Sequence, residues 1–429
     1  MQTQILSNMK KRVLSLFSCG GGMDIGFEGG FKILKCSLNA NIHPDWIEKE
    51  DEKYYYLKET IFETVFANDI VDCAKAAWVD YFGKKRGTSV AERYVVRSIV
   101  DLVKEHKEGK ANVFPQDVDI VTGGFPCQDF SVAGKRKGFN SEVSHNGQKA
   151  EIDAPSEETR GKLYMWMKEV IEITRPKIFI AENVKGLANL GEVKKIIQND
   201  FAKIGGDGYL VLTPQVLHAG RYGISQSRER IFFIGIDKSA LTAEALNELS
   251  RDDIFSEYSP YPTPTHLLEK DLPPIGRDIA SMQPFVPSEK VLADLEEPEN
   301  STDLSQMNYS KAKFIKGLQG NTEVKLNKLA PTIRSEHHGN IEFRRLSLEH
   351  GGVNFGEIDK GLPERRLSVR ECARIQTFPD DYNFVIRNNK RYIVSPSSGY
   401  KLVGNAVPPL LAYHIAKKIE GNWRYYFNE

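Results

Sequence analysis

Short apolar runs that suit buried strands recur along the first 240 residues of the chain and alternate with segments of helical pattern. The runs lie at residues 13–18, 61–67, 118–121, 177–181, 209–217 and 231–236. Helices are expected at residues 23–27, 92–107, 163–174, 367–376 and 410–419. Continuous apolar strands that alternate with helices are typical of an α/β fold built on an open, mostly parallel sheet.

The pattern changes at about residue 241, where long periodic segments give way to a sequence rich in Pro, Ser, Asp and Glu. Residues 241–364 are therefore expected to form a second, smaller and irregular domain. Residues 1–240 would form the first part of the main domain, and residues 365–429 would return to it. Two stretches lack a clean period: residues 31–60 are expected to be a surface insertion, and the polar residues 134–160 a lid or a loop insertion.

A cysteine follows the apolar run that ends at Val121. Gly123 and Gly124 let the backbone turn, and Pro126 fixes φ directly before Cys127. Ligands bind at the carboxyl ends of the strands in an open α/β sheet, so a thiol held there is a candidate nucleophile. A buried structural cysteine is the commoner fate of a free thiol, and these residues alone leave both interpretations open.

Polar side chains also flank two other predicted strands. Glu182 and Asn183 follow the run at 177–181, which brings a carboxylate and an amide to the same sheet edge if the strands are parallel. Arg228 and Arg230 alternate just before the run at 231–236, so their guanidinium groups share one face. The plainer alternatives are a cap on the following turn for Glu182 and a solvated basic edge for the arginines.

Three consecutive glycines, residues 20–22, separate the first predicted strand from the first predicted helix. Such a turn lets a ligand approach the backbone closely. The spacing does not match G-x-G-x-x-G, because Ile25 stands where the third glycine should be. Asp69 follows the second strand, where such folds hold ribose hydroxyls; its alternative role is the cap of a helix that starts near Asp72.

Composition and cysteine spacing disfavour some classes of protein but do not identify a function. The chain has 429 residues, of which 40% are hydrophobic, and 58 basic residues balance 58 acidic ones. No apolar run approaches the ~20 residues that span a bilayer, and the start is polar, so we expect a cytoplasmic protein with no membrane segment. The five cysteines are scattered without a CxxC pair, which favours free thiols over disulfides or a metal site.

Any basic surface must be local, because the net charge is zero. The second domain holds one basic group suited to phosphate or base-edge contacts. Its members are Arg334, His337, His338, Arg344 and Arg345. A solvated charged face is the alternative interpretation.

Six short segments carry a more specific signal together than any does alone. They are Phe17-Ser-Cys-Gly-Gly-Gly-Met23, Gly124-Phe-Pro-Cys-Gln128, Glu182-Asn-Val184, Gln226-Ser-Arg-Glu-Arg230, Arg370-Glu-Cys-Ala-Arg-Ile-Gln376 and Gly404-Asn-Ala-Val-Pro408. In type and order they resemble the signature motifs of the DNA cytosine-C5 methyltransferases, over residues 13–237 and from about 329 to the end. The resemblance implies a Rossmann-like methyltransferase sheet with a target-recognition domain at residues 241–364.

The resemblance also implies roles for the candidate catalytic residues. Cys127 would add to carbon 6 of a cytosine flipped out of duplex DNA, since carbon 5 is too unreactive to take a methyl group directly. Glu182 would hold N3 and the exocyclic amine, and Arg230, aided by Arg228, would hold O2 and support Glu182. Asn183 would fix the loop that carries the nucleophile.

S-adenosylmethionine is the methyl donor that the resemblance implies, and no metal is expected. The positions that match the family's donor pocket are Phe17, Gly21, Gly22, Met23, Asp69, Ile70, Leu163, Asn405 and Val407. Asp69 would hold the ribose hydroxyls and Ile70 would pack on the adenine.

Several positions depart from the family pattern. Cys19 stands where the family usually has glycine, and Ser98 lies in the segment 97–99 where an Asp usually holds the adenine amine, so no residue is assigned to that contact. Insertions at residues 31–60 and 141–156 lengthen the chain before Asp69 and after the expected nucleophile.

Double-stranded DNA is the partner expected of a monomeric methyltransferase of this family, which would protect host DNA beside a cognate restriction endonuclease. Three rival functions are disfavoured by the sequence. A tRNA-modifying relative would carry a cysteine in the recognition region, and none lies between Cys127 and Cys372. An inactive homologue would not need the set of Cys127, Glu182 and Arg230, and a nucleotide-dependent oxidoreductase is disfavoured by the glycine spacing.

Overall fold

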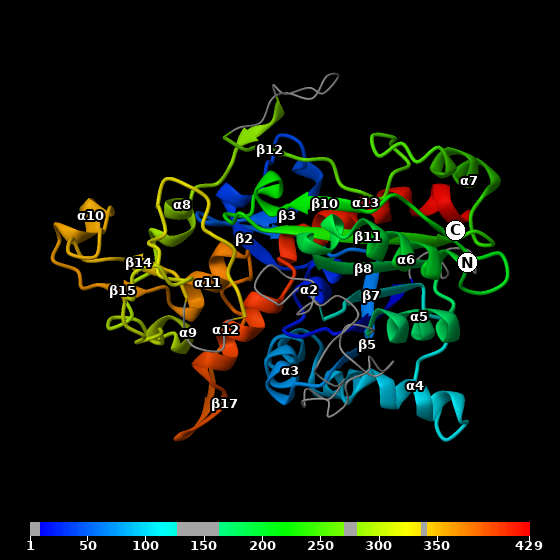
Figure 1. Ribbon diagram of the computed structural model, residues 1–429, viewed down its shortest axis with the longest axis horizontal. Helices are drawn as coiled ribbons and strands as arrows, with labels where there is room; N and C mark the ends of the chain where they lie inside the picture. Colours follow the sequence, from blue (N-terminus) through cyan, green and yellow to red (C-terminus); the bar gives the residue numbers. More distant parts are fainter. Residues whose placement is uncertain (1–8, 127–162, 270–280, 336–340) are drawn as a thin grey trace.

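The computed structural model describes residues 9–126, 163–269, 281–335 and 341–429. Cys127, Gln128, the expected loop 134–160, His337 and His338 lie outside the described residues. In the remainder the chain forms a mixed α/β fold around one large sheet, which confirms the predicted fold class (Figure 1).

The central sheet has the order β10-β11-β8-β7-β1-β5-β6, with β9 also paired to β11. Its strands are β1 (Lys11–Leu16), β5 (Phe62–Asp69), β6 (Tyr94–Val96), β7 (Ile120–Gly124), β8 (Ile178–Val184), β9 (Tyr209–Val211), β10 (Gln215–His218) and β11 (Glu229–Asp237). The five strands from β8 to β6 run parallel, whereas β11 is antiparallel to β8 and to β10. The carboxyl ends of β1, β5, β7 and β8 therefore meet at one edge.

Helices cover both faces of this sheet. The helices are α2 (Gly22–Glu28), α3 (Asp72–Arg86) and α13 (Pro409–Phe427) on one face, and α4 (Ile99–Lys107), α5 (Leu163–Thr174) and α6 (Gly191–Ala202) on the other. Val13 and Leu14 of β1 lie in different hydrophobic clusters, one on each face. Burial on both faces explains why the strands are continuous apolar runs without polar alternation.

The stretch 31–60, expected as a surface insertion, is an ordered three-stranded antiparallel sheet. Its strands are β2 (Lys32–Leu34), β3 (Ile47–Glu50) and β4 (Tyr54–Leu57). The Trp46 ring packs edge-on against Tyr413 of α13, and the Asn39 side chain donates to the carbonyl oxygens of Thr265 and Ser281. The prediction missed this sheet because its apolar residues are buried by partners more than 200 residues away in the chain.

After the central strands, the chain forms short elements with many loops, as expected of an irregular domain. They are α7 (Ala243–Ser250), β12 (His266–Leu267), β13 (Gln283–Pro284), α8 (Ser288–Leu292), α9 (Leu304–Met307), β14 (Phe343–Arg345), α10 (Phe355–Ile358) and β15 (Arg365–Arg366). Figure 1 shows α8, α9, α10, β14 and β15 together at one end of the molecule. Helix α7 instead contacts α13, and the domain boundaries at 240 and 364 stay predictions.

The chain then returns through α11 (Val369–Ile375), the hairpin of β16 (Ile386–Asn388) and β17 (Arg391–Val394), and α12 (Pro396–Asn405). Ser368 and Glu371 form a capping box that starts α11. Short 3-10 helices complete the fold: η1 (Lys35–Ser37), η2 (Pro44–Trp46), η3 (Thr88–Arg93), η5 (Lys185–Asn189) and η6 (Ala219–Tyr222).

Two local features differ from the prediction. The expected helix 92–107 is interrupted, because Tyr94–Val96 form the edge strand β6 and only Ile99–Lys107 are α-helical. Helix α12 was not predicted; Pro396 at its first turn and the Ser395 cap begin it.

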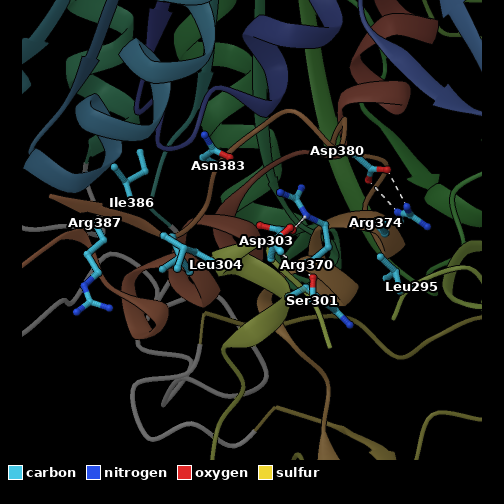
Figure 2. Close-up of a pocket in the computed structure, with 13 residues that line it drawn as sticks. Leu295, Ser301, Asp303, Leu304, Arg370, Arg374, Asp380, Asn383, Ile386 and Arg387 are labelled. Carbon is cyan, nitrogen blue, oxygen red and sulfur yellow. Dashed lines mark hydrogen bonds and ion pairs between the residues drawn. The ribbon is translucent and has the colours of Figure 1, made fainter. Parts of the chain in front are cut away.

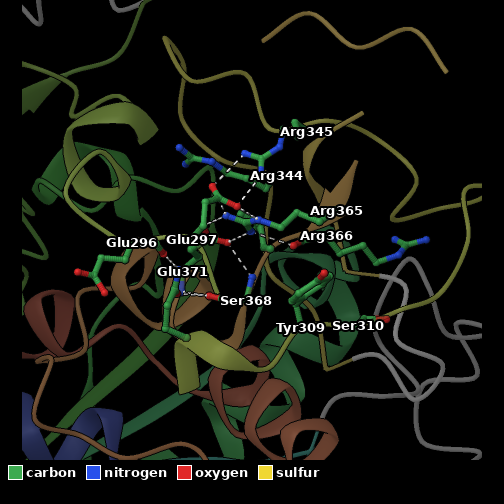
Figure 3. A network of polar contacts seen from close by, with 12 residues as sticks. Glu296, Glu297, Tyr309, Ser310, Arg344, Arg345, Arg365, Arg366, Ser368 and Glu371 are labelled. Atoms are coloured by element: carbon green, nitrogen blue, oxygen red, sulfur yellow. Dashed lines mark hydrogen bonds and ion pairs between the residues drawn. The ribbon is translucent and has the colours of Figure 1, made fainter. Parts of the chain in front are cut away.

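Two arginines of the predicted basic group are not available to a ligand, because they are buried in ion pairs (Figure 3). Arg345 is fully buried between Glu297 and Glu357, and Arg344 also pairs with Glu357. Burial alone would raise the pKa of Glu297, but hydrogen bonds from Arg365 and Arg345 lower it to about 2. This network holds the irregular region together, so Arg344 and Arg345 stabilise its fold.

Candidate active site

The strand register brings Gly124 beside Glu182. Strands β7 and β8 are parallel neighbours, and Gly124 pairs with Glu182 at their carboxyl ends. A Cβ atom on Gly124 would lie 2.8 Å from Oε2 of Glu182, closer than non-bonded atoms approach. The prediction that Gly123 and Gly124 form a turn was wrong: both lie within β7, where glycine leaves room for neighbouring side chains.

Glu182 forms an ion pair with Arg230 of the next strand. The Arg230 Nε atom lies 3.0 Å from Oε1 of Glu182, and the two side chains are 13% and 10% exposed. Burial raises the pKa of the Glu182 carboxyl, while the positive charges of Arg230 and Arg228 oppose the rise. The result is a carboxyl group that keeps its proton to higher pH than an ordinary glutamate, as a general acid requires.

Asn183 ties β8 to the segment that precedes Cys127. Its Nδ2 atom donates to the carbonyl oxygen of Phe125 at 3.1 Å, and its Oδ1 atom accepts from the Val184 amide at 2.8 Å. The side chain is buried. Both ends of the amide are thus engaged with backbone, which fixes the position of Phe125 at the end of β7.

The Arg228 side chain donates to backbone carbonyl oxygens of both the irregular region and the returning chain. Its Nη1 atom donates to the carbonyl oxygen of Ile333 at 3.1 Å, and its Nη2 atom donates to those of Gly404 and Ala406, each at 2.9 Å. The side chain is buried. Arg228 therefore fastens the start of β11 to the last segment of the chain.

The glycine turn, residues 17–22, has an unusual backbone. Phe17 and Cys19 have φ angles of 53° and 49°, which side-chain-bearing residues rarely adopt. A Cβ atom on Gly22 would lie 2.2 Å from the Val407 carbonyl oxygen, and one on Gly21 would lie 2.5 Å from the Trp78 ring. The glycines thus admit the packing of the turn against α3 and the returning chain.

Asp69 lies at the end of β5 and accepts hydrogen bonds from backbone amides. Its Oδ2 atom accepts from Cys19 at 2.9 Å, and its Oδ1 atom from Ile70 at 2.7 Å and Val71 at 3.2 Å. Burial raises the pKa of this carboxyl, and the three amides oppose the rise. Asp69 therefore joins the glycine turn to the residues just before α3. The alternative role as the cap of this helix was wrong, because its N-cap is Val71 and no side chain caps it; the ribose contact stays a prediction.

The other predicted donor-pocket positions differ in exposure. Ile70 is 43% exposed beside the buried carboxyl of Asp69, and Asn405 is also exposed. Met23, Leu163 and Val407 are buried.

Sequence reasoning missed the side chains that support the glycine turn. Tyr382 donates to the Gly20 carbonyl oxygen at 2.7 Å, and Tyr94 donates to that of Cys19 at 3.0 Å. Trp78 donates to Asp24 at 2.8 Å, and burial raises the pKa of Asp24 to about 6. No local sequence pattern predicts these contacts, because the partners lie far apart in the chain.

The Gly124→Ala variant tests the close approach of β7 to Glu182. The added methyl group would push the carboxyl away from Arg230, so we expect kcat to fall roughly 100-fold, the usual scale for a displacement of about 1 Å. Steady-state methylation assays measure this. Gly191→Ala is the matched control, since nothing lies within 4 Å of its Cβ position; equal activity of both variants would contradict the prediction.

Comparison with known proteins decides the family. The family model described as C-5 cytosine-specific DNA methylase matches residues 11–421. The chain belongs to this family. It is accordingly a DNA cytosine-5 methyltransferase, and the resemblance of the six motifs is confirmed.

Curated relatives agree over nearly the whole chain. Type II methyltransferase M.BspRI of Lysinibacillus sphaericus is 31% identical, covering 96% of this chain and 81% of that protein. Type II methyltransferase M.FnuDI of Fusobacterium nucleatum is 28% identical, covering 95% of this chain and 94% of that protein. Among solved structures, the Entamoeba histolytica methyltransferase EhMeth shares the fold with a TM-score of 0.51 at 13% identity, covering 96% of this chain and 99% of that one.

Membership of the family carries its general chemistry. Such enzymes act on DNA and take their methyl group from S-adenosylmethionine. Over the described ranges, no helix is long and apolar enough to cross a membrane, and no group of side chains in that part of the chain is arranged to hold a metal ion.

Proposed function

We propose that this DNA cytosine-5 methyltransferase acts through a covalent bond between Cys127 and carbon 6 of a cytosine that has been flipped out of duplex DNA. The observation that carries the proposal is the buried Glu182–Arg230 pair beside Gly124. Cys127 follows Gly124 by three residues in sequence. A nucleophile, a proton donor and a cation therefore come from neighbouring strand ends.

The chemistry of cytosine explains why these groups are needed together. Addition of the Cys127 sulfur to carbon 6 moves an electron pair into the ring and makes carbon 5 nucleophilic. The protonated Glu182 carboxyl donates to N3 and neutralises the charge that arrives there. After methylation, loss of the proton on carbon 5 and cleavage of the carbon–sulfur bond restore the aromatic ring and free Cys127.

The remaining polar residues position this set. Arg230 holds the Glu182 carboxyl and donates to O2 of the base. Asn183 fixes Phe125 through its carbonyl oxygen, and thereby the entry to the segment that carries Cys127. Arg228 acts at a distance: it binds one backbone carbonyl of the irregular region and two of the returning chain, and it adds positive charge near Glu182.

The residues at the glycine turn fit S-adenosylmethionine. Each carboxylate oxygen has two acceptor positions, so Asp69 Oδ2, which accepts one amide, retains capacity for a ribose hydroxyl. The exposed Ile70 beside it offers an apolar surface for the adenine ring. Phe17, the glycines of the turn, Met23, Leu163, Asn405 and Val407 complete the proposed site. When bound, the donor supplies an electrophilic methyl group to carbon 5.

We infer the biological role, protection of host DNA, from the names of the relatives. Several are named Type II methyltransferases, so we place this enzyme in the cytoplasm as a monomer that protects host DNA from a cognate restriction endonuclease. The irregular region would contact the DNA and select the sequence. Gln128, Ser131 and the segment 134–160 are the proposed residues that close on the flipped base.

Trapping on 5-fluorocytosine tests the covalent mechanism. Fluorine at carbon 5 cannot leave as a proton does, so duplex DNA with this base and S-adenosylmethionine should give a protein–DNA complex that survives denaturing electrophoresis. The target sequence comes first, from bisulfite mapping of methylated plasmid DNA. Trapping on tRNA but not duplex DNA, or no trapping by an active enzyme, would contradict the proposal.

A further inference from the structure

The hairpin of β16 and β17 is a basic element that projects from the molecule and that the catalytic proposal does not use. Its sequence from Ile386 to Val394 contains Arg387, Lys390 and Arg391 and no acidic residue. All three cations are exposed. Figure 1 shows β17 projecting from the edge of the molecule, beside α3.

These cations differ from nearby arginines, whose charges are neutralised by carboxylates. A cavity of about 570 Å³ lies at the root of the hairpin, and Figure 2 shows Arg387 at one end of it. Deeper in the cavity, Arg370 pairs with Asp303 at 2.6 Å and Arg374 pairs with Asp380 at 2.7 Å. Within the described part of the chain, no carboxylate pairs with Arg387, Lys390 or Arg391. The hairpin therefore carries uncompensated positive charge.

The cations point in different directions. Neighbouring residues of a strand face opposite sides, and Arg387 pairs with Tyr392 whereas Arg391 pairs with Asn388. The Arg387 guanidinium lies 5.7 Å from the Tyr392 ring centre, which places both on one side. Arg391 is on the other side, and Lys390 lies in the turn with Asn389, whose φ is 52°.

This arrangement fits a groove of duplex DNA. The major groove admits a two-stranded ribbon, and phosphates border it on both sides. A ribbon with a guanidinium on each face can reach both borders. Its root is firm, because Tyr382, four residues before β16, donates to Gly20 of the glycine turn, and Asn383 donates to Asp80 of α3.

We propose that the β16–β17 hairpin is a DNA-binding arm, in which Arg387, Lys390 and Arg391 contact phosphates of the duplex that is methylated. The inference rests on the proposed action on duplex DNA. It adds a contact surface outside the irregular region 241–364, to which sequence selection was assigned. Because the contacts are to phosphate, they strengthen binding without selecting the sequence.

The salt dependence of DNA binding tests the arm. Each phosphate contact contributes about 0.9 to the slope of log Kd against log salt concentration, so the triple variant R387A/K390A/R391A should lose up to about 2.7 of slope. Wild-type affinity should then fall about 40-fold more than that of the variant between 50 and 200 mM salt. Fluorescence anisotropy on a labelled duplex that the wild type methylates measures both. At saturating DNA, kcat should be unchanged while KM for DNA rises.

Two control variants distinguish a direct contact between the hairpin and DNA phosphates from a general effect of lost positive charge. K203A/K238A/R424A removes the same charge at the ends of α6, β11 and α13, on the other side of the molecule (Figure 1), and should keep the wild-type slope. R387K/R391K keeps the charge of the hairpin and should also keep the wild-type slope. A wild-type slope in R387A/K390A/R391A, or an equal loss in K203A/K238A/R424A, overturns the inference. Failure of wild type to methylate duplex DNA would instead refute the proposed function.

Discussion

Replacing Cys127 by alanine is expected to abolish methyl transfer while leaving DNA binding intact. Without the sulfur, no bond forms at carbon 6 and carbon 5 stays unreactive, whatever Glu182 and Arg230 contribute. Turnover should fall by at least about 10⁴-fold, in line with the loss of nucleophiles in other enzymes. Incorporation of a radioactive methyl group into duplex DNA measures turnover, and a gel-shift assay measures binding.

A second cysteine gives the control for this substitution. Cys36 is half-buried in η1, and its thiol lies 3.8 Å from the Lys290 carbonyl oxygen. Cys36→Ala should keep activity within about threefold of wild type, since removing a thiol at such a site affects packing alone. Residual turnover near wild type in Cys127→Ala would refute the covalent mechanism.

The central sheet could be predicted from sequence because its strands are buried on both faces. Ile178 and Ile180 lie in one hydrophobic cluster and Phe179 in the other, so the run has no polar break. An apolar run followed by Glu182 and Asn183 predicts a buried strand and the polar residues at its carboxyl end. The ion pair of Glu182 with Arg230 was foreseen through the family resemblance; neither residue alone specified the other.

Other features depend on contacts that no local pattern records. Gly123 and Gly124 looked like turn residues, yet they lie in β7. Glycine is needed there because the side chains of Met167 and Glu182 occupy the space that a Cβ atom would fill. Arg345 looked like a ligand-binding cation, yet Glu297, 48 residues earlier, buries and neutralises it. In each case the deciding neighbour is remote in sequence, so composition and spacing could not supply it.

Glu182→Gln is expected to lower kcat about 10²- to 10⁴-fold, the usual contribution of a positioned proton donor. Glutamine has nearly the same shape and can still accept a hydrogen bond from Arg230, so β8 and the ion-pair geometry should be little disturbed. It cannot deliver a proton to N3. Single-turnover methylation measures the chemical step. Glu229→Gln is the control that should stay near wild type, because Glu229 is a half-buried neighbour that pairs with Lys185.

The pH dependence of kcat/KM distinguishes a proton donor from a merely structural carboxyl. Burial raises the pKa of Glu182, so the protonated form persists to higher pH, and activity should fall as pH rises through that raised pKa. The thiolate is the nucleophilic form of Cys127, so its formation adds a limb that rises with pH, which makes the wild-type profile bell-shaped. Glutamine does not titrate, so in Glu182→Gln the falling limb should vanish and the remaining rate should only rise with pH. If the variant keeps the falling limb, another group donates the proton, and Glu182 serves only to hold Arg230.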